Sequence, residues 1–498
     1  MKAKALDASM REHVGMRQSL PALLGAAGAS LLLATGCGGH AARTLEARNA
    51  LDAGHPKRAL ALLNEELGVS RAADLPQNVG GDQAILLLDR AMVLQQLDDY
   101  ALASRDLGVA DKQVEVLDLS RGAAADIGRY LFSDSSGAYK APAYEKLMIN
   151  SMNMVNYLVR SDLGGARVEA RRLAVMQRFL SEHENPGASL LGPGSYLAGF
   201  TFEKSGRAED ALRYYDEALK YGKYRSLAEP VKRLAKSSSY RSPRLRALLG
   251  KDDPLLKPEP EPVKDEPAKD EPAKDEPAKA AAIEPPPAKV EPAPEASMGE
   301  LLVIVSFGRV PAKHAERVPI GLALTYAAGA ISPTDRGRAN ALAAQGLVTW
   351  INYPELGKPR GQYDIPTFAL DGRWQSLEGM LAVDREVERA WQEARGAVIA
   401  SAITRMITRV VAGEAVRQGS GGGALGLLLS LGTQATMVAA DTPDTRSWAT
   451  LPARIAFGRA WLKPGRHSVL LGARSIEKVK YVDVRAGGFS VVNLTVLH

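Results

Sequence analysis

The 498-residue sequence predicts a multidomain protein with an all-α region of helical repeats, a proline-rich disordered linker and a C-terminal α+β domain with antiparallel β-strands. Three observations lead to this fold class. Small and aromatic residues recur at helical spacing before the linker, prolines and charges dominate 251–298, and short apolar runs separated by turn residues follow. The expected boundaries are a signal peptide at 1–36, helical repeats at 37–250 and the α+β domain at 299–498.

The N-terminal segment has the pattern of a bacterial lipoprotein signal. Basic residues precede an apolar run over 20–33, which is the order found in secretory signals. The run ends in "ATGC", which resembles a lipobox, so cleavage is expected after Gly36 and lipidation, for example with palmitate, at Cys37. Cys37 is the single cysteine, which excludes an intrachain disulfide. A plain signal with an incidental cysteine is the alternative interpretation, and Met16 is an alternative start.

The lipid anchor predicts a place in the cell envelope. Two or more acyl chains hold a protein to a bilayer almost permanently. Gly38 stands where an aspartate retains lipoproteins at the inner membrane of enteric-type bacteria, so we expect the periplasmic face of the outer membrane. The net charge of +6 comes from scattered lysines and arginines, which argues against a nucleic-acid partner.

Paired helices are predicted before the linker. The stretch "SYLAGFTFEKSGRAEDALRYYDEALKYG" resembles a tetratricopeptide repeat (TPR), in which small residues let two helices approach and aromatic side chains fill the space between them. The expected packing residues of this copy are Gly199, Phe202, Gly206, Ala211, Tyr215 and Ala218. Weaker copies supply Ala91, Tyr100, Ala103, Gly165 and Ala170.

An array of such pairs buries a continuous core and leaves a concave face, where we expect a protein partner to dock. The segment from Arg121 to Glu145 interrupts the array. It is interpreted either as a loop packed on its own repeats or as a loop that contacts a partner.

The linker repeats the unit Lys-Asp-Glu-Pro-Ala from Lys264 onward. Proline removes backbone hydrogen-bond donors, and this composition cannot form a core, so the segment is expected to be disordered. Two interpretations remain open. It is either a tether, extending at ~3.1 Å per residue, or an insertion between two domains that touch.

After the linker, extended segments are expected at 300–310, 346–356 and 363–374. A helical hairpin is expected over 383–440, followed by a β-rich tail over 451–497. The first helix of the hairpin carries an apolar stripe of Val387, Trp391, Ala394 and Val398. The second, Ala424 to Ala440, is expected to pack on the sheet, with a membrane-touching hairpin as the alternative.

No pattern in the sequence predicts an enzyme, a cofactor or a metal site. Seven histidines are spread widely, and no pair has the helical spacing of metal ligands. The nucleophile motif Gly-x-Ser-x-Gly is absent, and the glycine-rich "QGSGGGALG" lacks the Lys-Ser/Thr of a phosphate-binding loop.

Three phrases resemble an uncharacterised group of bacterial TPR-like lipoproteins. They are "YEKLMINSMNMVNYLVRSDLGGARVEARR" (144–172), "FGRVPAKHAERVPI" (307–320) and "DTRSWATLPARIAFGRAWLKPGRHSV" (444–469). The resemblance implies an envelope location beside lipoproteins similar to the curli-secretion channel and to penicillin-binding-protein activators. It supplies no catalytic residues.

We therefore expect a protein-binding scaffold in the envelope, with cell-wall synthesis or secretion machinery as partners. One alternative is a component of a secretion or export assembly whose apolar hairpin touches the membrane. A further, weaker alternative is an envelope hydrolase.

Overall fold

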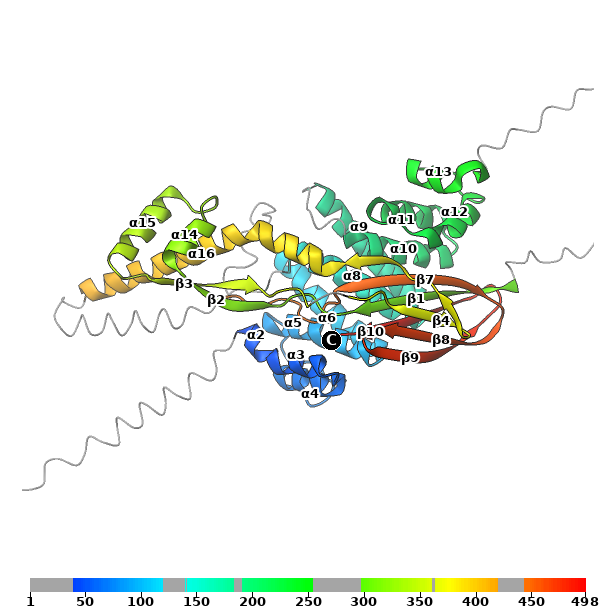
Figure 1. The fold of residues 1–498 in the computed structure, drawn as a ribbon, viewed down its shortest axis with the longest axis horizontal. Helices are drawn as coiled ribbons and strands as arrows, with labels where there is room; N and C mark the ends of the chain where they lie inside the picture. Colours follow the sequence, from blue (N-terminus) through cyan, green and yellow to red (C-terminus); the bar gives the residue numbers. More distant parts are fainter. Residues whose placement is uncertain are drawn as a thin grey trace, which may run out of the picture.

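The computed structural model describes residues 39–119, 139, 141–182, 190–253, 297–360, 363–419 and 443–498. Gly36, Cys37 and the rest of the predicted signal lie outside the described residues, as do 254–296 of the linker and 420–442 with the second helix of the predicted hairpin. The described residues form an all-helical N-terminal part and a C-terminal α+β part, as the sequence predicted (Figure 1).

The N-terminal part is a succession of helices that pack mainly against their neighbours along the chain. Its α-helices are α2 (His40–Arg43), α3 (Leu45–Asp52), α4 (Pro56–Glu66), α5 (Asp82–Gln96), α6 (Tyr100–Leu119), α8 (Ala143–Val159), α9 (Leu163–Glu182), α10 (Leu191–Lys204), α11 (Ala208–Tyr221), α12 (Ala228–Ala235) and α13 (Pro243–Leu249). Short 3₁₀ turns are η3 (Arg225–Leu227) and η4 (Gly250–Asp252). The pairs α3–α4, α5–α6, α8–α9 and α10–α11 are in direct contact.

The pair α10–α11 shows how small residues let these helices approach. Gly206 has a φ of +72° in the turn between them, a conformation that glycine adopts at little cost. A Cβ atom at Gly199 would lie 2.4 Å from the ring of Tyr215, so the ring occupies the space that a side chain would fill. In α8–α9 the ring of Tyr157 approaches Gly165 equally closely, at 2.3 Å from an added Cβ atom.

The C-terminal part combines ten strands with three helices among the described residues. The strands are β1 (Gly299–Phe307), β2 (Lys313–Pro319), β3 (Trp350–Leu356), β4 (Thr367–Leu370), β5 (Arg373–Gln375), β6 (Glu378–Ala382), β7 (Arg454–Leu462), β8 (Gly465–Ala473), β9 (Ile476–Val484) and β10 (Phe489–Val496). The helices are α14 (Ile320–Tyr326), α15 (Pro333–Ala344) and α16 (Val383–Gly419).

The strands form two four-stranded sheets and one hairpin. Sheet 1 has the order β10-β1-β7-β6, sheet 2 has the order β5-β4-β8-β9, and β2 pairs with β3. The expectation of antiparallel strands is correct for most pairs but wrong for β1 and β10, which are parallel, with Glu300 opposite Phe489. Strand β1 is a central strand buried on both faces, as parallel strands commonly are. The tail reaches β1 only after the β8–β9 hairpin of sheet 2, so β10 does not pair with β1 through a hairpin turn.

The protein has three layers: the helices, sheet 1 and sheet 2 (Figure 1). On β1, Leu302 and Ile304 belong to a core shared with the helices, whereas Val303 and Val305 belong to the core between the two sheets. The rings of Tyr196 on α10 and Phe457 on β7 stack with centroids 4.6 Å apart. The N-terminal and C-terminal parts are therefore joined by a continuous apolar core.

The helical face that we expected to be open to a partner is covered by the chain itself. Residues Ala84 to Gln95 of α5 are all buried, and α5 and α8 both contact β10. This face of α5 and α8 is therefore not open for docking. The contacts also favour the interpretation of the linker as an insertion between domains that touch.

Strands β2 and β3 and helices α14, α15 and most of α16 form an arm that extends from this body (Figure 1). Three residues of the predicted stripe on α16 are buried as expected, with Val387 in the core of the body and Trp391 and Val398 in a separate core of the arm. Ala394, the fourth, is half-buried against the core of the arm. Helices α14 and α15 had no counterpart in the prediction.

The predicted insertion from Arg121 to Glu145 is described only near its end. Tyr139 and Tyr144 are buried against the helices, in agreement with the interpretation of a segment packed on its own repeats. Residues 120–138 and 140 lie outside the described part of the chain.

Candidate functional site

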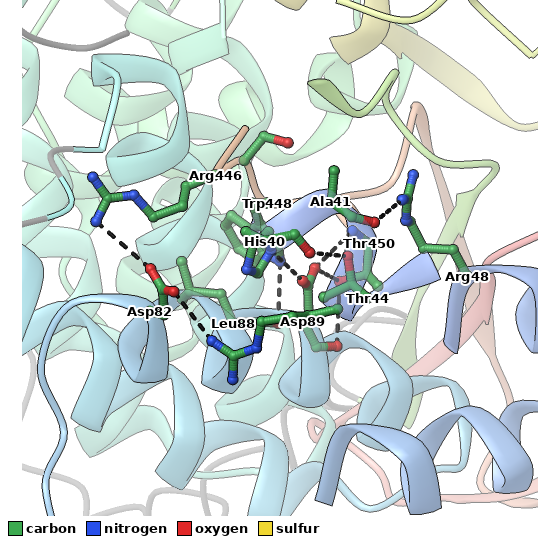
Figure 2. Close-up of polar contacts among 12 residues, drawn as sticks. His40, Ala41, Thr44, Arg48, Asp82, Leu88, Asp89, Arg446, Trp448 and Thr450 are labelled. Atoms are coloured by element: carbon green, nitrogen blue, oxygen red, sulfur yellow. Dashed lines mark hydrogen bonds and ion pairs between the residues drawn. The ribbon is translucent and has the colours of Figure 1, made fainter. Parts of the chain in front are cut away.

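Three segments that are distant in the sequence meet in a buried junction at the start of the described chain (Figure 2). The junction consists of α2, the middle of α5 and the tail segment 443–453. Its central side chains are His40, Asp89 and Trp448, all of them buried. Because His40 is the third residue after Cys37, the junction fixes the chain next to the predicted lipidation site.

Trp448 is the largest fully buried side chain and connects the tail to two helices. Its indole Nε1–H donates a hydrogen bond to the carbonyl oxygen of Leu88 over 3.1 Å. Its backbone N–H donates to Oε1 of Glu145 over 3.0 Å. The other carboxylate oxygen of Glu145 accepts a 2.5 Å hydrogen bond from the hydroxyl of Tyr139. Both N–H groups of Trp448 therefore have acceptors in the interior.

Asp89 connects the tail to the first helix. Its Oδ1 accepts hydrogen bonds of 2.9 Å from both the backbone N–H and the hydroxyl of Thr450. Its Oδ2 lies 3.4 Å from Nε2 of His40. A further hydrogen bond of 3.1 Å runs from the backbone N–H of Ala41 to the hydroxyl of Thr445. Helix α2 is too short to be stable alone, so these contacts hold it in place.

Two buried charged groups next to the junction, Glu145 and Lys313, have shifted pKa values. Burial raises the pKa of Glu145, against the opposing effects of its hydrogen bonds from Trp448 and Tyr139. Burial lowers the pKa of Lys313 to about 8, although Asp444 and Glu145 partly counteract the effect. The Lys313 ammonium donates a 2.9 Å hydrogen bond to the carbonyl oxygen of Arg446. These groups tie β2 to the tail segment in a water-poor environment.

The hydrogen bonds of the junction hold its side chains to one another. The Thr450 hydroxyl is bonded to Asp89 rather than to His40, so the residues do not form a nucleophile–base pair. Within the described ranges, no cluster of three or more His, Cys, Asp or Glu side chains is placed to hold a metal ion. Among the helices of the same ranges, none combines the length and apolarity needed to cross a bilayer.

The residues predicted to pack the repeats are distributed over several helix pairs rather than gathered at one site. Buried packing positions are occupied by Ala91, Tyr100, Ala103, Ala170, Phe202, Ala211, Tyr215 and Ala218. Gly199 meets Tyr215, and both are among the predicted packing residues, whereas Gly165 meets Tyr157, which was not predicted to pack there. Phe202 stacks on Tyr214 with ring centroids 5.3 Å apart.

The central residues of the junction were not identified from the sequence as members of one site. Trp448 lies in "DTRSWATLPAR", and Glu145 lies in "YEKLMINSMNM", two of the phrases that carry the family resemblance. That resemblance was the available signal. It did not indicate that Trp448 contacts Glu145, 303 residues away in the chain.

No protein-family model matches the chain, and a search of curated proteins gives no match either.

Proposed function

We propose that the chain is a lipoprotein on the periplasmic face of the outer membrane, where it acts as a protein-binding scaffold. The observation that carries the proposal is the position of His40. This side chain is buried three residues after Cys37, and three residues span at most about 10 Å. A lipid on Cys37 would therefore hold the body directly against the bilayer.

The helical pairs support the proposal of a TPR-like scaffold, since Gly199 of α10 packs closely against the ring of Tyr215 on α11. Because the inner face of the helices is covered by sheet 1, the proposed partner surface is the arm. Trp350 on β3 is 42 % exposed there, and Leu322 and Tyr326 of α14 are exposed nearby in the same arm. Aromatic residues of this kind are typical anchors of protein interfaces. The proposed partners are envelope proteins of cell-wall synthesis or secretion.

The lipid anchor is tested by replacing Cys37 with alanine. The expected result is complete loss of radioactive palmitate from the protein, because the acylated thiol is gone. Ala34→Leu is the matched control and should keep the label, since leucine is common at that lipobox position. In a second version, a cleavable secretory signal replaces residues 1–37, and carbonate extraction should release the protein completely. An unlabelled wild type would contradict the proposal, and retention after extraction would favour the membrane-touching alternative.

The scaffold role is tested by in-cell crosslinking from the arm. A photoreactive residue at Trp350 should give crosslinks to one or a few envelope proteins, because the exposed ring lies on the proposed partner surface. The matched control is the same residue at Val175 on α9, which is 70 % exposed but lies outside the arm. Equal crosslinking from both positions would count against the arm as the partner surface.

A further inference from the structure

A cationic pocket lies beside α3, between the end of β1 and the end of β3. Its volume is about 210 Å³, far more than one water molecule needs. The pocket is lined by Arg48, Arg309, Lys313, His314, Lys358 and Arg360, together with backbone and small residues. It adjoins the junction, because Nη2 of Arg48 donates a 2.5 Å hydrogen bond to the carbonyl oxygen of Ala41 on α2.

Arg309 is the residue that indicates a missing ligand. Its side chain is only 1 % exposed, and its Nη2 donates a 2.6 Å hydrogen bond to Asp52. Its Nε and Nη1 have no hydrogen-bond partner within the described part of the chain. Leaving charged donors buried without acceptors is costly, so an acceptor in the pocket would remove a penalty. Burial and the neighbouring Arg360 lower the pKa of Arg309 to about 10, even though Asp52 opposes this shift.

The acidic groups near the pocket do not balance its cations. Asp52 is bound by both Arg309 and Arg360, so its single charge is shared between two guanidinium groups. Among the described residues, Nε of Arg48 is buried without a hydrogen-bond partner, although Asp89 and Asp52 attract its charge. The ammonium of Lys313 donates a hydrogen bond to the carbonyl oxygen of Arg446. His314 lies 3.6 Å from Glu316 and is largely exposed.

We propose that this pocket binds a phosphate group, which either an anionic phospholipid headgroup or a soluble phosphate ester can supply. Guanidinium groups match the paired oxygens of phosphate and bind them with two parallel hydrogen bonds. The Nε and Nη1 atoms of Arg309 lie on different edges of the guanidinium, so each of them offers a single charged donor to a phosphate oxygen. The lipid source, but not phosphate binding itself, rests on the proposed anchoring at Cys37.

Calorimetric titration of the full-length protein in detergent, with glycerol phosphate as the probe, tests the binding itself. The wild type should bind, and Arg309→Met should weaken the affinity by about tenfold or more, since a buried cation and a charge-assisted hydrogen bond are lost. Arg360→Met keeps the buried arginine and should also weaken binding while leaving the melting temperature nearly unchanged. Arg338→Met, on an exposed residue of α15, is the control and should bind as the wild type does.

A second arm identifies the source of the phosphate. The lipidated protein is reconstituted in phosphatidylcholine vesicles with or without phosphatidylglycerol, and its melting temperature is measured. A rise with phosphatidylglycerol that disappears in Arg360→Met assigns the headgroup, whereas binding of glycerol phosphate alone assigns a soluble ester. The proposal is overturned if neither probe binds, or if both arginine variants bind as tightly as the wild type. If glycerol phosphate binds but Cys37 carries no lipid, the pocket is a phosphate site and only the proposed lipid anchor is wrong.

Discussion

Replacing Arg459 with methionine is expected to lower the free energy of unfolding by about 3–5 kcal/mol, the range for breaking a buried ion pair from one side. Arg459 lies on β7, buried between sheet 1 and the helices. Its guanidinium binds Glu203 of α10 over 2.9 Å, together with Glu300 of β1 and the hydroxyl of Tyr215. The variant leaves the two buried carboxylates with Lys204 as their one remaining shared cation, and Glu203 keeps Arg233 as well. Urea unfolding followed by tryptophan fluorescence measures the loss.

The same variant should change the response to acid. Burial raises the pKa of Glu203, but Arg459, Lys204 and Arg233 outweigh it, so the folded pKa is lowered from 4.5. The stability that this carboxylate contributes is therefore present above pH 4.5 and is lost as the pH falls toward the lower folded value. Without Arg459, the effect of burial is less opposed, so the pKa of Glu203 in the folded protein rises. The stability difference between the two proteins should narrow below pH 4.5.

Two control variants separate the buried pair from a general effect of lost charge. Arg213→Met removes a 56 % exposed arginine that pairs with Glu209 on α11, and it should change stability by no more than about 0.5 kcal/mol. The triple variant Arg459→Met, Glu203→Gln, Glu300→Gln removes both buried negative charges and should recover part of the loss. A stability for Arg459→Met within about 1 kcal/mol of the wild type would show that the interior accommodates both carboxylates.

The elements that could be predicted from the sequence are those whose residue pattern lies within one short stretch of the chain. The stripe of Val387, Trp391 and Val398 has helical spacing, and these side chains are buried on α16 as that spacing requires. The apolar run of β1 indicated a buried strand in the same way. The position of this strand between two layers had no local signal, because it depends on β10, whose residues lie almost 190 positions later in the chain.

The candidate site could not be assembled from the sequence for the same physical reason. Asp89 and Thr450 are 361 positions apart in the chain. An aspartate in an apolar helical stretch gives no indication of which distant residue it will contact. His40 was one of seven scattered histidines. Arg309 lies in "FGRVPAKHAERVPI", which marks the segment, but the unsatisfied donors of its guanidinium follow from burial and become visible only in three dimensions.

Replacing Trp448 with alanine is expected to cost about 3–5 kcal/mol of stability, because it removes the largest fully buried side chain and leaves a cavity. The carbonyl of Leu88 loses its hydrogen-bond donor at the same time. Trp448→Phe keeps most of the volume but not the N–H group, so it should cost less, with about 1 kcal/mol from the lost hydrogen bond. Trp374→Ala, on a 65 % exposed side chain of β5, is the matched control and should remain within about 0.5 kcal/mol of the wild type.

Hydrogen exchange extends this experiment from stability to the position of the anchor. If Trp448 and its tail segment hold α2, the Trp448→Ala variant should exchange the amides of Ala42 and Thr44 much faster than the wild type, because these amides close the turns of α2. Amides of α13, at the other end of the helical part, should change less. Equal changes in both helices would mean that the variant loosens the whole fold. Unchanged exchange in α2 would mean that its own turns, rather than the junction, keep the chain beside Cys37 in place.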